Sequence, residues 1–480
     1  MDPCSNKDIR LADIKNTNPP VVKVALKLRD PQGTQGLTAK VLDTASGSYN
    51  LVYTVLFSDG TQVVVKINQA AHRKGKCACW TEWRPNTPFR MESEVRTLRQ
   101  IKRLTTIPVP IVYDFNSSFD NELGFPYMVM ELLPGRSAWY MWRETVEINA
   151  ENYRLRTNFL NTLAGYVLQL NQFVADDLGY PVWDGSKLSV VPQHDYPLDS
   201  RLAGIRPLTS VPGRDLLRAA LLGYNARELP PLGRSDPRLW AYSCLLREAT
   251  FWLPVHASET GDFRAPAVLA HPDLDLQNIL VDRHYNITGI IDWDGIRAVP
   301  RVLGNEAFPR WLIIDCIGPR KYHYQILPDG TVFNRASQDS PGQMVFWRSR
   351  WVDVIANHFK ADPNMQVVAA GHAARSVYFR LLEVFGLPHF DTTRWAIGGF
   401  LEHVLRDPTF TSTWRETDFL AKPFPPRPPP QPVTLDEVIR TLYERKASPR
   451  QWGMLQERFS TYDFAIPMRF LIETERNARE

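Results

Sequence analysis

Short apolar runs separated by turn residues occupy the first part of the chain. They are residues 41–42, 51–57, 62–67, 111–115 and 126–133. The first connection contains Gly47, the second contains Ser58-Asp59-Gly60, and the last run ends at Pro134-Gly135. Apolar segments bounded by such turn residues are typical of strands joined by short connections. This part of the chain therefore predicts an antiparallel, β-rich region.

Helical spacing appears once inside this region and dominates after Gly135. Apolar residues recur at helical intervals from Met91 to Leu104, until Pro108-Val-Pro110 ends the pattern. The stripe from Phe159 to Val174 predicts one long packing helix, and residues 343–385 predict another helical region. Residues 184–236 are interrupted by prolines and glycines, which predicts loops around one short helix at residues 214–222.

These patterns divide the 480 residues into a small β-rich lobe and a larger helical lobe. An apolar run, residues 21–28, stands out in a polar leader. A proline-rich stretch reads as a stiff spacer, and the capping box Thr434-Leu-Asp-Glu437 behind it predicts a last helix. The expected fold class is thus α+β, with a leader, β-rich lobe, helical lobe, linker and C-terminal helical segment at residues 1–38, 39–133, 134–420, 421–433 and 434–480.

Candidate chemistry is concentrated in the stretch His271-Pro-Asp-Leu-Asp-Leu-Gln-Asn278. The apolar runs at residues 279–281 and 287–291, with the turn-prone residues 282–286 between them, predict a hairpin after this loop. A hairpin of this size brings Asn278 at its start beside Asp292 at its end. Amide and carboxylate oxygens are ligands that Mg²⁺ prefers. Asp273, on the loop in front, is then available to accept a proton from a hydroxyl group.

These spacings match the pattern H-x-D-x-x-x-x-N followed by a metal-binding aspartate. With Pro-Asp-Leu after His271 and Ile-Asp-Trp at residues 291–293, the chain resembles the aminoglycoside phosphotransferase family, related to choline kinase, and most closely its large fungal branch. Phe308-Pro-Arg-Trp-Leu312 resembles another motif of that branch. The resemblance covers roughly residues 41–312, and the motifs occur in the family's order. Asp275 stands where the family usually has a second histidine.

The resemblance implies a two-lobed, protein-kinase-like fold and transfer of the γ-phosphoryl group of ATP to a small molecule. It implies that Gly47, Ser48, Asn50 and Lys66 hold the phosphates, and that Glu94 pairs with Lys66. Glu92 is the competing partner for that lysine. The adenine would bind main-chain groups at the hinge, from Glu131 to Leu133, although these residues equally fit an ordinary buried strand. Asp273 would be the base, His271 would brace the loop, and Mg²⁺ would lie between Asn278 and Asp292.

Composition limits the classes of partner that we expect for this chain. A net charge of +4 without a long Lys/Arg run argues against a nucleic-acid partner, and no apolar stretch is long enough to span a membrane. The first residues are not a signal peptide, and five cysteines indicate a reducing compartment, so we expect a cytoplasmic protein. The expected partners are ATP and a small-molecule acceptor, whereas the sequence indicates no oligomeric state.

Three observations leave alternatives open. The segment from His72 to Cys79 offers at most three zinc ligands and is better explained as a solvated basic loop. Asp275 and Asp294 could attract a cationic acceptor, such as an amine-bearing alcohol, or simply cap backbone N–H groups. Function itself has two alternatives. A silent ATP-binding scaffold is disfavoured by the intact set of site residues, and a protein kinase is disfavoured because no Ala-Pro-Glu segment follows Asp292.

Overall fold

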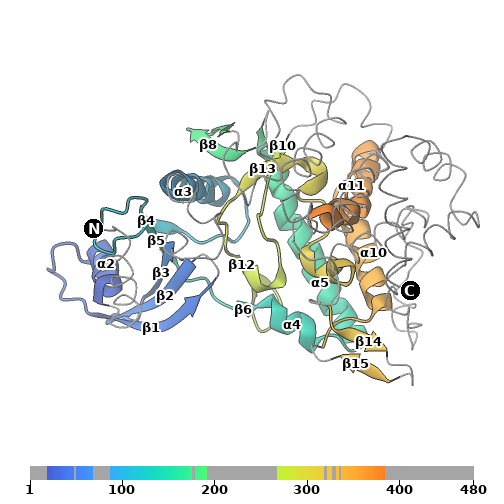
Figure 1. Ribbon diagram of the computed structural model, residues 1–480, viewed down its shortest axis with the longest axis horizontal. Coiled ribbons are helices and arrows are strands. Elements are labelled where there is room, and N and C mark those ends of the chain that lie inside the picture. Colours follow the sequence, from blue (N-terminus) through green and yellow to red (C-terminus); the bar gives the residue numbers. More distant parts are fainter. Residues whose placement is uncertain are drawn as a thin grey trace, which may run out of the picture.

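The computed structural model describes residues 19–47, 50–68, 87–175, 179–191, 267–317, 322–326, 331–334 and 337–383. The segment from His72 to Cys79, the short helix expected at residues 214–222, and the C-terminal linker and helix lie outside these residues. The described part has an antiparallel sheet followed by a mainly helical region, which confirms the expected α+β class (Figure 1). None of its helices is both long enough and apolar enough to cross a lipid bilayer.

A five-stranded antiparallel sheet forms the N-terminal lobe, in the order β1-β2-β3-β5-β4. Along β2 nearly every second side chain is fully buried, as expected for a strand with one face on a core. Lys66 lies in the middle of the sheet on β3, opposite Val52 and Met128. The strands are β1 (Ala39–Ser46), β2 (Asn50–Phe57), β3 (Gln62–Asn68), β4 (Val112–Asn116) and β5 (Tyr127–Glu131).

Two helices accompany this sheet. Helix α3 (Thr87–Leu104) begins four residues before the apolar pattern that predicted it, and it buries Val95, Leu98 and Ile101. Helix α2 (Pro19–Arg29) lies within the expected leader and packs its residues Val21 and Val24 into the same core as β2 and β3. The apolar run of the leader is therefore part of the N-terminal lobe.

After Gly135, short strands flank the loop at residues 271–278, and helices pack around them. Strands β6, β11 and β12 form one small sheet, and β7, β10 and β13 form another. These strands are β6 (Arg136–Ser137), β7 (Val174–Ala175), β10 (Ala267–Ala270), β11 (Ile279–Val281), β12 (Ile287–Ile290) and β13 (Arg297–Pro300). A separate hairpin, β8 (Tyr180–Asp184) with β9 (Lys187–Val191), occupies the start of the segment expected to be an insert.

Helix α5 (Ala150–Val167) lies beside α10 (Pro341–His358), which in turn packs on α11 (Pro363–Glu383) (Figure 1). Smaller elements complete the described lobe: α4 (Ala138–Glu144), η3 (Leu168–Gln172), η7 (Leu276–Asn278), η8 (Arg301–Leu303), η9 (Arg310–Ile313), α9 (Ile314–Ile317), β14 (Tyr324–Ile326) and β15 (Val332–Asn334). The region expected to be helical at residues 343–385 is thus two helices, with a turn at residues 359–362 between them.

The long helix predicted from the stripe at Phe159 is present, but it does not extend to Val174 as expected. The α-helix ends at Val167 and continues as the tighter 3₁₀ helix η3, and Val174 lies in β7 opposite Val268 of β10. The side chain of Asn171 donates a hydrogen bond to Glu306 Oε1 at 2.9 Å. Pairing with β10 and this contact are long-range interactions, and they override the local apolar period.

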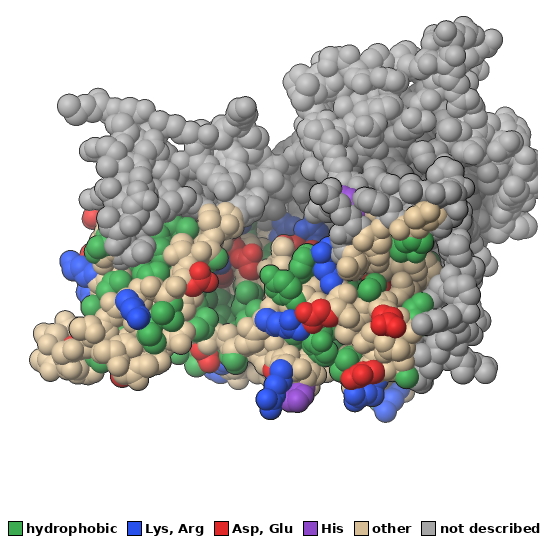
Figure 2. All heavy atoms as spheres, turned by 90° about the horizontal axis from the view of Figure 1, so that it is seen from below, with side chains coloured by type: hydrophobic (Ala, Val, Ile, Leu, Met, Phe, Trp, Pro, Cys, Tyr) green, Lys and Arg blue, Asp and Glu red, His purple; other side chains and the backbone are tan. Residues whose placement is uncertain are grey.

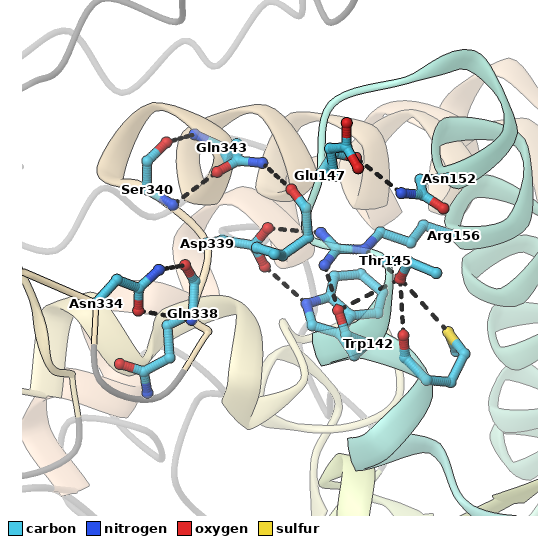
Figure 3. A network of polar contacts seen from close by, with 12 residues as sticks. Trp142, Thr145, Glu147, Asn152, Arg156, Asn334, Gln338, Asp339, Ser340 and Gln343 are labelled. Carbon is cyan, nitrogen blue, oxygen red and sulfur yellow. Dashed lines mark hydrogen bonds and ion pairs between the residues drawn. The ribbon is translucent and has the colours of Figure 1, made fainter. Parts of the chain in front are cut away.

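A buried ion pair joins α4, α5 and the start of α10 (Figure 3). The Arg156 guanidinium is fully buried and donates through Nη1 to Asp339 Oδ1 at 2.6 Å. Trp142 Nε1 donates to the other Asp339 oxygen at 2.7 Å, and Arg156 Nε donates to Thr145 Oγ1 at 3.0 Å. With both charges compensated and hydrogen-bonded, the network holds these helices of the C-terminal lobe together.

Candidate active site

The loop between β10 and β11 is anchored by His271. Its Nε2 lies 3.0 Å from the carbonyl oxygen of Ile291, and the backbone N–H of Asp273 donates to Nδ1 at 3.1 Å. Because Nδ1 accepts, the neutral ring carries its proton on Nε2 and donates it to Ile291. Burial lowers the pKa of His271, which favours this neutral form. The contacts are those of a residue that ties the loop to the end of β12.

The hairpin β11–β12 brings Asn278 close to the residues that follow β12. Ile279 is opposite Ile290, and the backbone N–H of Ile291 donates to the carbonyl oxygen of Asn278 at 2.9 Å. Asp292 then has a left-handed backbone with φ of 64°. An aspartate in this region is uncommon, and such strain occurs preferentially at functional sites. The geometry therefore places Asn278 and Asp292 at the same end of one hairpin.

These two residues have the donor chemistry that Mg²⁺ requires. Asn278 Nδ2 donates to the carbonyl oxygen of Asp273 at 2.9 Å, so the amide oxygen points away from that carbonyl. The Asp292 side chain is 47% exposed and has carboxylate oxygens available to a ligand. No group of three or more His, Cys, Asp or Glu side chains suited to a metal occurs in the described ranges. Two oxygen ligands from the protein fit a magnesium ion that is also bound by phosphates and water.

Lys66 links the two lobes. Its Nζ lies 3.0 Å from Glu94 Oε1 on α3 and 3.6 Å from Asp292 Oδ1 beyond β12. Burial alone would lower the pKa of the Lys66 amine, but the carboxylates of Glu94, Asp292 and Asp294 raise it above its ordinary value. Burial raises the pKa of Glu94 to about 7, although the Lys66 cation favours its ionised form. Lys66 thus stays protonated at neutral pH and directs a positive charge toward Asp292.

The structure distinguishes the two glutamates that the sequence left open. Glu94 is buried and contacts Lys66, whereas Glu92 accepts a hydrogen bond from Ser117 Oγ at 2.9 Å and lies 4.0 Å from Arg96. Glu92 and Glu94 lie about 200° apart around α3, so only one of them can face β3.

Asp294 connects the first hairpin to the residues after Asp292. Its carboxylate accepts a hydrogen bond from Asn50 Nδ2 at 3.4 Å and lies 3.9 Å from Arg90 Nη2 on α3. The N–H of Gly47 donates to the carbonyl oxygen of Asn50 at 2.9 Å and closes the turn between β1 and β2. Ser48 lies outside the described residues. Asp294 thus has partners on β2 and α3. The expected role of Asp294 in acceptor binding did not predict these contacts.

At the hinge, the Glu131 side chain lies over β4 and Leu133 lies against β12. Glu131 Oε2 accepts a hydrogen bond from the backbone N–H of Ile111 at 3.0 Å and is 3.6 Å from Lys102 Nζ. A Cβ atom at Gly289 would lie 2.8 Å from Leu133 Cδ1, so the Leu133 side chain packs closely against this glycine. The side chains thus pack on both lobes, and any nucleotide contact here would use backbone groups.

Asp275 begins the 3₁₀ helix η7, and its Oδ1 accepts a hydrogen bond from the backbone N–H of Leu276 at 2.8 Å. Replacing Asp275 by alanine is expected to lower the free energy of unfolding by about 1 kcal/mol, because this backbone bond is lost. Asparagine at position 275 retains an acceptor oxygen and should restore the stability. Urea denaturation of the three proteins measures both values, and an alanine variant as stable as the parent would contradict the capping role.

The sequence did not identify one further contact. Arg310, from the segment Phe308–Leu312, donates through Nη1 to Asp273 Oδ1 at 2.7 Å. The two residues are 37 positions apart and lie in different elements. The spacing of the two residues does not predict the contact. The only signal in the sequence is that the segment Phe308–Leu312 resembles a known motif. On the face shown in Figure 2, some acidic side chains lie near the junction between the lobes, and others are scattered over the helical lobe.

Comparisons with known proteins show which family and which relatives this chain is similar to. The model of the phosphotransferase enzyme family, APH, matches residues 41–302. A subtelomeric hrmA-associated cluster protein of Aspergillus fumigatus is 24% identical over 334 residues, 59% of this chain and 63% of the relative. Clavilactone A biosynthesis cluster protein Y of Ampulloclitocybe clavipes is 25% identical over 273 residues, 55% of this chain and 62% of the relative. The matches thus span less than two thirds of these relatives.

Two solved structures are also similar to the chain. An ethanolamine kinase of Plasmodium vivax has a TM-score of 0.38 and 11% identity, with 88% of each chain covered. A macrolide 2'-phosphotransferase of Brachybacterium faecium has a TM-score of 0.33 and 16% identity, with 74% of this chain and 98% of that chain covered.

Proposed function

Because this chain belongs to the phosphotransferase enzyme family, APH, we propose that it transfers the γ-phosphoryl group of ATP to a hydroxyl group of a small molecule. The proposal depends above all on Lys66. Its protonated amine is buried between Glu94 of the N-terminal lobe and Asp292 of the C-terminal lobe. A cation held in this way, facing an oxygen-ligand pair, is suited to bind the phosphates of a nucleotide.

Each residue of the site has a chemical task in this proposal. Lys66 binds the phosphates, and Asn278 and Asp292 hold Mg²⁺, which when bound neutralises phosphate charge. Asp273 lies on the loop before Asn278 and orients and deprotonates the acceptor hydroxyl group. Phosphoryl transfer passes through a loose transition state, so catalysis comes mainly from positioning and from compensation of charge. His271 keeps the loop in place through its bond to Ile291.

The acceptor is proposed to be a secondary metabolite, which the name of the relative from the clavilactone A biosynthesis cluster supports. An amine-bearing acceptor receives no support from Asp275 or Asp294. The first caps its own 3₁₀ helix, and the second contacts Asn50 and lies near Arg90. The proposal therefore names the reacting group of the acceptor, a hydroxyl, without requiring a cation on it.

Incubation of the protein with ATP, Mg²⁺ and a fungal metabolite extract tests the proposal. Mass spectrometry should detect one small molecule that gains a single phosphoryl group while ADP forms. A protein that binds ATP but forms no ADP would be a scaffold. Phosphorylation of protein but not of small molecules would make it a protein kinase. Either outcome would refute the proposed function.

Replacing Lys66 by methionine is expected to weaken ATP binding roughly tenfold or more, because charge-assisted hydrogen bonds to the phosphates are lost. Isothermal titration calorimetry with Mg²⁺ and a non-hydrolysable ATP analogue measures the affinity. The control is Lys23→Met, since Lys23 is an exposed residue on α2 that lies 3.5 Å from Glu122. Glu94→Gln should have a smaller effect, because Lys66 keeps its contact with Asp292. Equal affinities for the parent protein and Lys66→Met would contradict the role of Lys66.

A further inference from the structure

The segment Phe308–Leu312 has no task in the proposed phosphoryl transfer, yet it lies beside the catalytic loop. Phe308, Trp311 and Leu312 are buried, and the backbone N–H of Phe308 donates to Ser376 Oγ of α11 at 2.8 Å. The Trp311 ring packs edge-on against Trp142, with 5.8 Å between the centroids. These contacts hold the 3₁₀ helix η9 firmly in the core of the helical lobe.

Arg310 differs from its neighbours because its side chain is 43% exposed. Its Nη1 donates to Asp273 Oδ1 at 2.7 Å, and its backbone N–H lies 3.3 Å from the carbonyl oxygen of Leu274. Side chain and backbone of one residue thus bind two consecutive residues of the catalytic loop. Arg310 therefore connects the carboxylate of Asp273 to η9, which is packed in the core.

The two oxygens of the Asp273 carboxylate have unequal partners. Oδ1 accepts the charge-assisted bond from Arg310, which is short and strong. Within the described part of the chain, Oδ2 has only long contacts, 3.4 Å to Asn278 Nδ2 and 3.5 Å to Gln277 Nε2. Such long contacts are weak and are easily exchanged for a better donor. An incoming hydroxyl group therefore meets Oδ2, while Oδ1 stays bound.

Stability is a poor explanation for this pair. Both side chains are partly exposed, and exposed ion pairs usually contribute little to the free energy of unfolding. A guanidinium group beside a carboxylate that must accept a proton needs another reason. We infer that Arg310 is a positioning residue, which holds Asp273 Oδ1 so that Oδ2 faces the acceptor hydroxyl group. The inference rests on the proposed function, because it assigns a partner to the base of that reaction.

Replacing Arg310 by methionine should lower kcat about tenfold to a hundredfold, part of the rate that a positioned base provides. KM for ATP should change less than about twofold, since the inference assigns to Arg310 a contact with the loop and no contact with ATP. Arg310→Lys should recover a substantial part of the rate, because its ammonium can bond one oxygen. Guanidinium chloride added at non-denaturing concentration should partly restore Arg310→Met by replacing the missing group.

The assay follows ADP formation from ATP with Mg²⁺. One reaction contains the acceptor found in the extract, and a second contains no acceptor, so that only water can receive the phosphoryl group. Arg103→Met is the matched control, because Arg103 is also an arginine that donates side-chain hydrogen bonds. Its partners are Gln100 and Ser186, which belong to other parts of the chain than Asp273. Thermal melts of all variants accompany the kinetics. The melting temperature of Arg310→Met should stay near that of the parent protein.

The outcomes separate the inference from the proposed function. No ADP formation by the parent protein refutes the proposed function and the inference with it. If the parent protein is active, an Arg310→Met variant with the same kcat overturns the inference alone. A second outcome also overturns the inference alone: kcat falls, neither lysine nor guanidinium restores it, and the melting temperature is lower. The loss of kcat would then be a structural effect.

Discussion

Replacing Asp273 by asparagine is expected to lower kcat by roughly 10² to 10⁴ while ATP binding is retained, because positioned base catalysis typically provides this factor. Asparagine keeps the shape of the side chain but cannot accept the proton. It should also keep an oxygen for the bond from Arg310 and leave the contact between Asn278 and the Asp273 carbonyl unchanged. The loss should therefore report on proton transfer more than on loop structure.

Steady-state kinetics on the acceptor, together with calorimetry of nucleotide binding, measures this effect. Asp275→Asn is the matched control within the same loop, because it makes the same chemical change at a carboxylate that caps η7. Its kcat should stay close to that of the parent protein. If Asp275 instead binds the acceptor, KM should rise while kcat is unchanged. An Asp273→Asn variant with the parent rate would remove the central assignment of the site.

Replacing Asp292 by alanine is expected to reduce turnover to the detection limit, a loss on the order of 10³-fold or more. The carboxylate is the charged member of the proposed metal pair, and compensation of phosphate charge is a main source of the rate of phosphoryl transfer. Alanine also fits poorly at a φ of 64°. Asparagine tolerates this backbone conformation, so Asp292→Asn separates the loss of charge from backbone strain.

The magnesium dependence of turnover provides the measurement. Asp292→Asn should require more Mg²⁺ than the parent protein, and Asn278→Ala should be partly rescued when Mg²⁺ is raised. Circular dichroism and thermal melts test whether each variant is folded. An Asp292→Ala enzyme with unchanged kcat would refute the metal assignment, whereas inactive but unfolded protein would be recognised by its melt.

The resemblance to the phosphotransferase family is confirmed by the family model, and the antiparallel sheet followed by helices confirms the fold class. The fold class was predictable because apolar periodicity and turn residues are local properties of the chain. The family was predictable because its motifs are short stretches of sequence with fixed spacing. The roles of Asp273, Asn278, Asp292 and Lys66 stay predictions, although the structure brings these residues into one region. Their kinetic tests are therefore more informative than further comparison of sequences.

The sequence by itself determined the parts of the site that are close along the chain. His271, Asn278 and Asp292 lie within 22 residues, and a short hairpin leaves its two ends little freedom to lie anywhere except side by side. The N-terminal strands were equally clear, since mainly apolar runs are separated there by turn residues such as Gly47, Gly60 and Pro134. In these segments local preference and tertiary structure agree.

Only the tertiary structure decided the contacts between distant segments. Lys66 and Glu94 are 28 positions apart, and packing of α3 on the sheet selects Glu94 over Glu92. Asp273 meets Arg310 because buried aromatic residues place η9 beside the loop. The buried pair Arg156–Asp339 spans 183 positions, and the apolar stripe that begins at Phe159 ends in a strand, where Val174 pairs with Val268 of β10. Such contacts depend on where whole elements pack, which no local period of residues encodes.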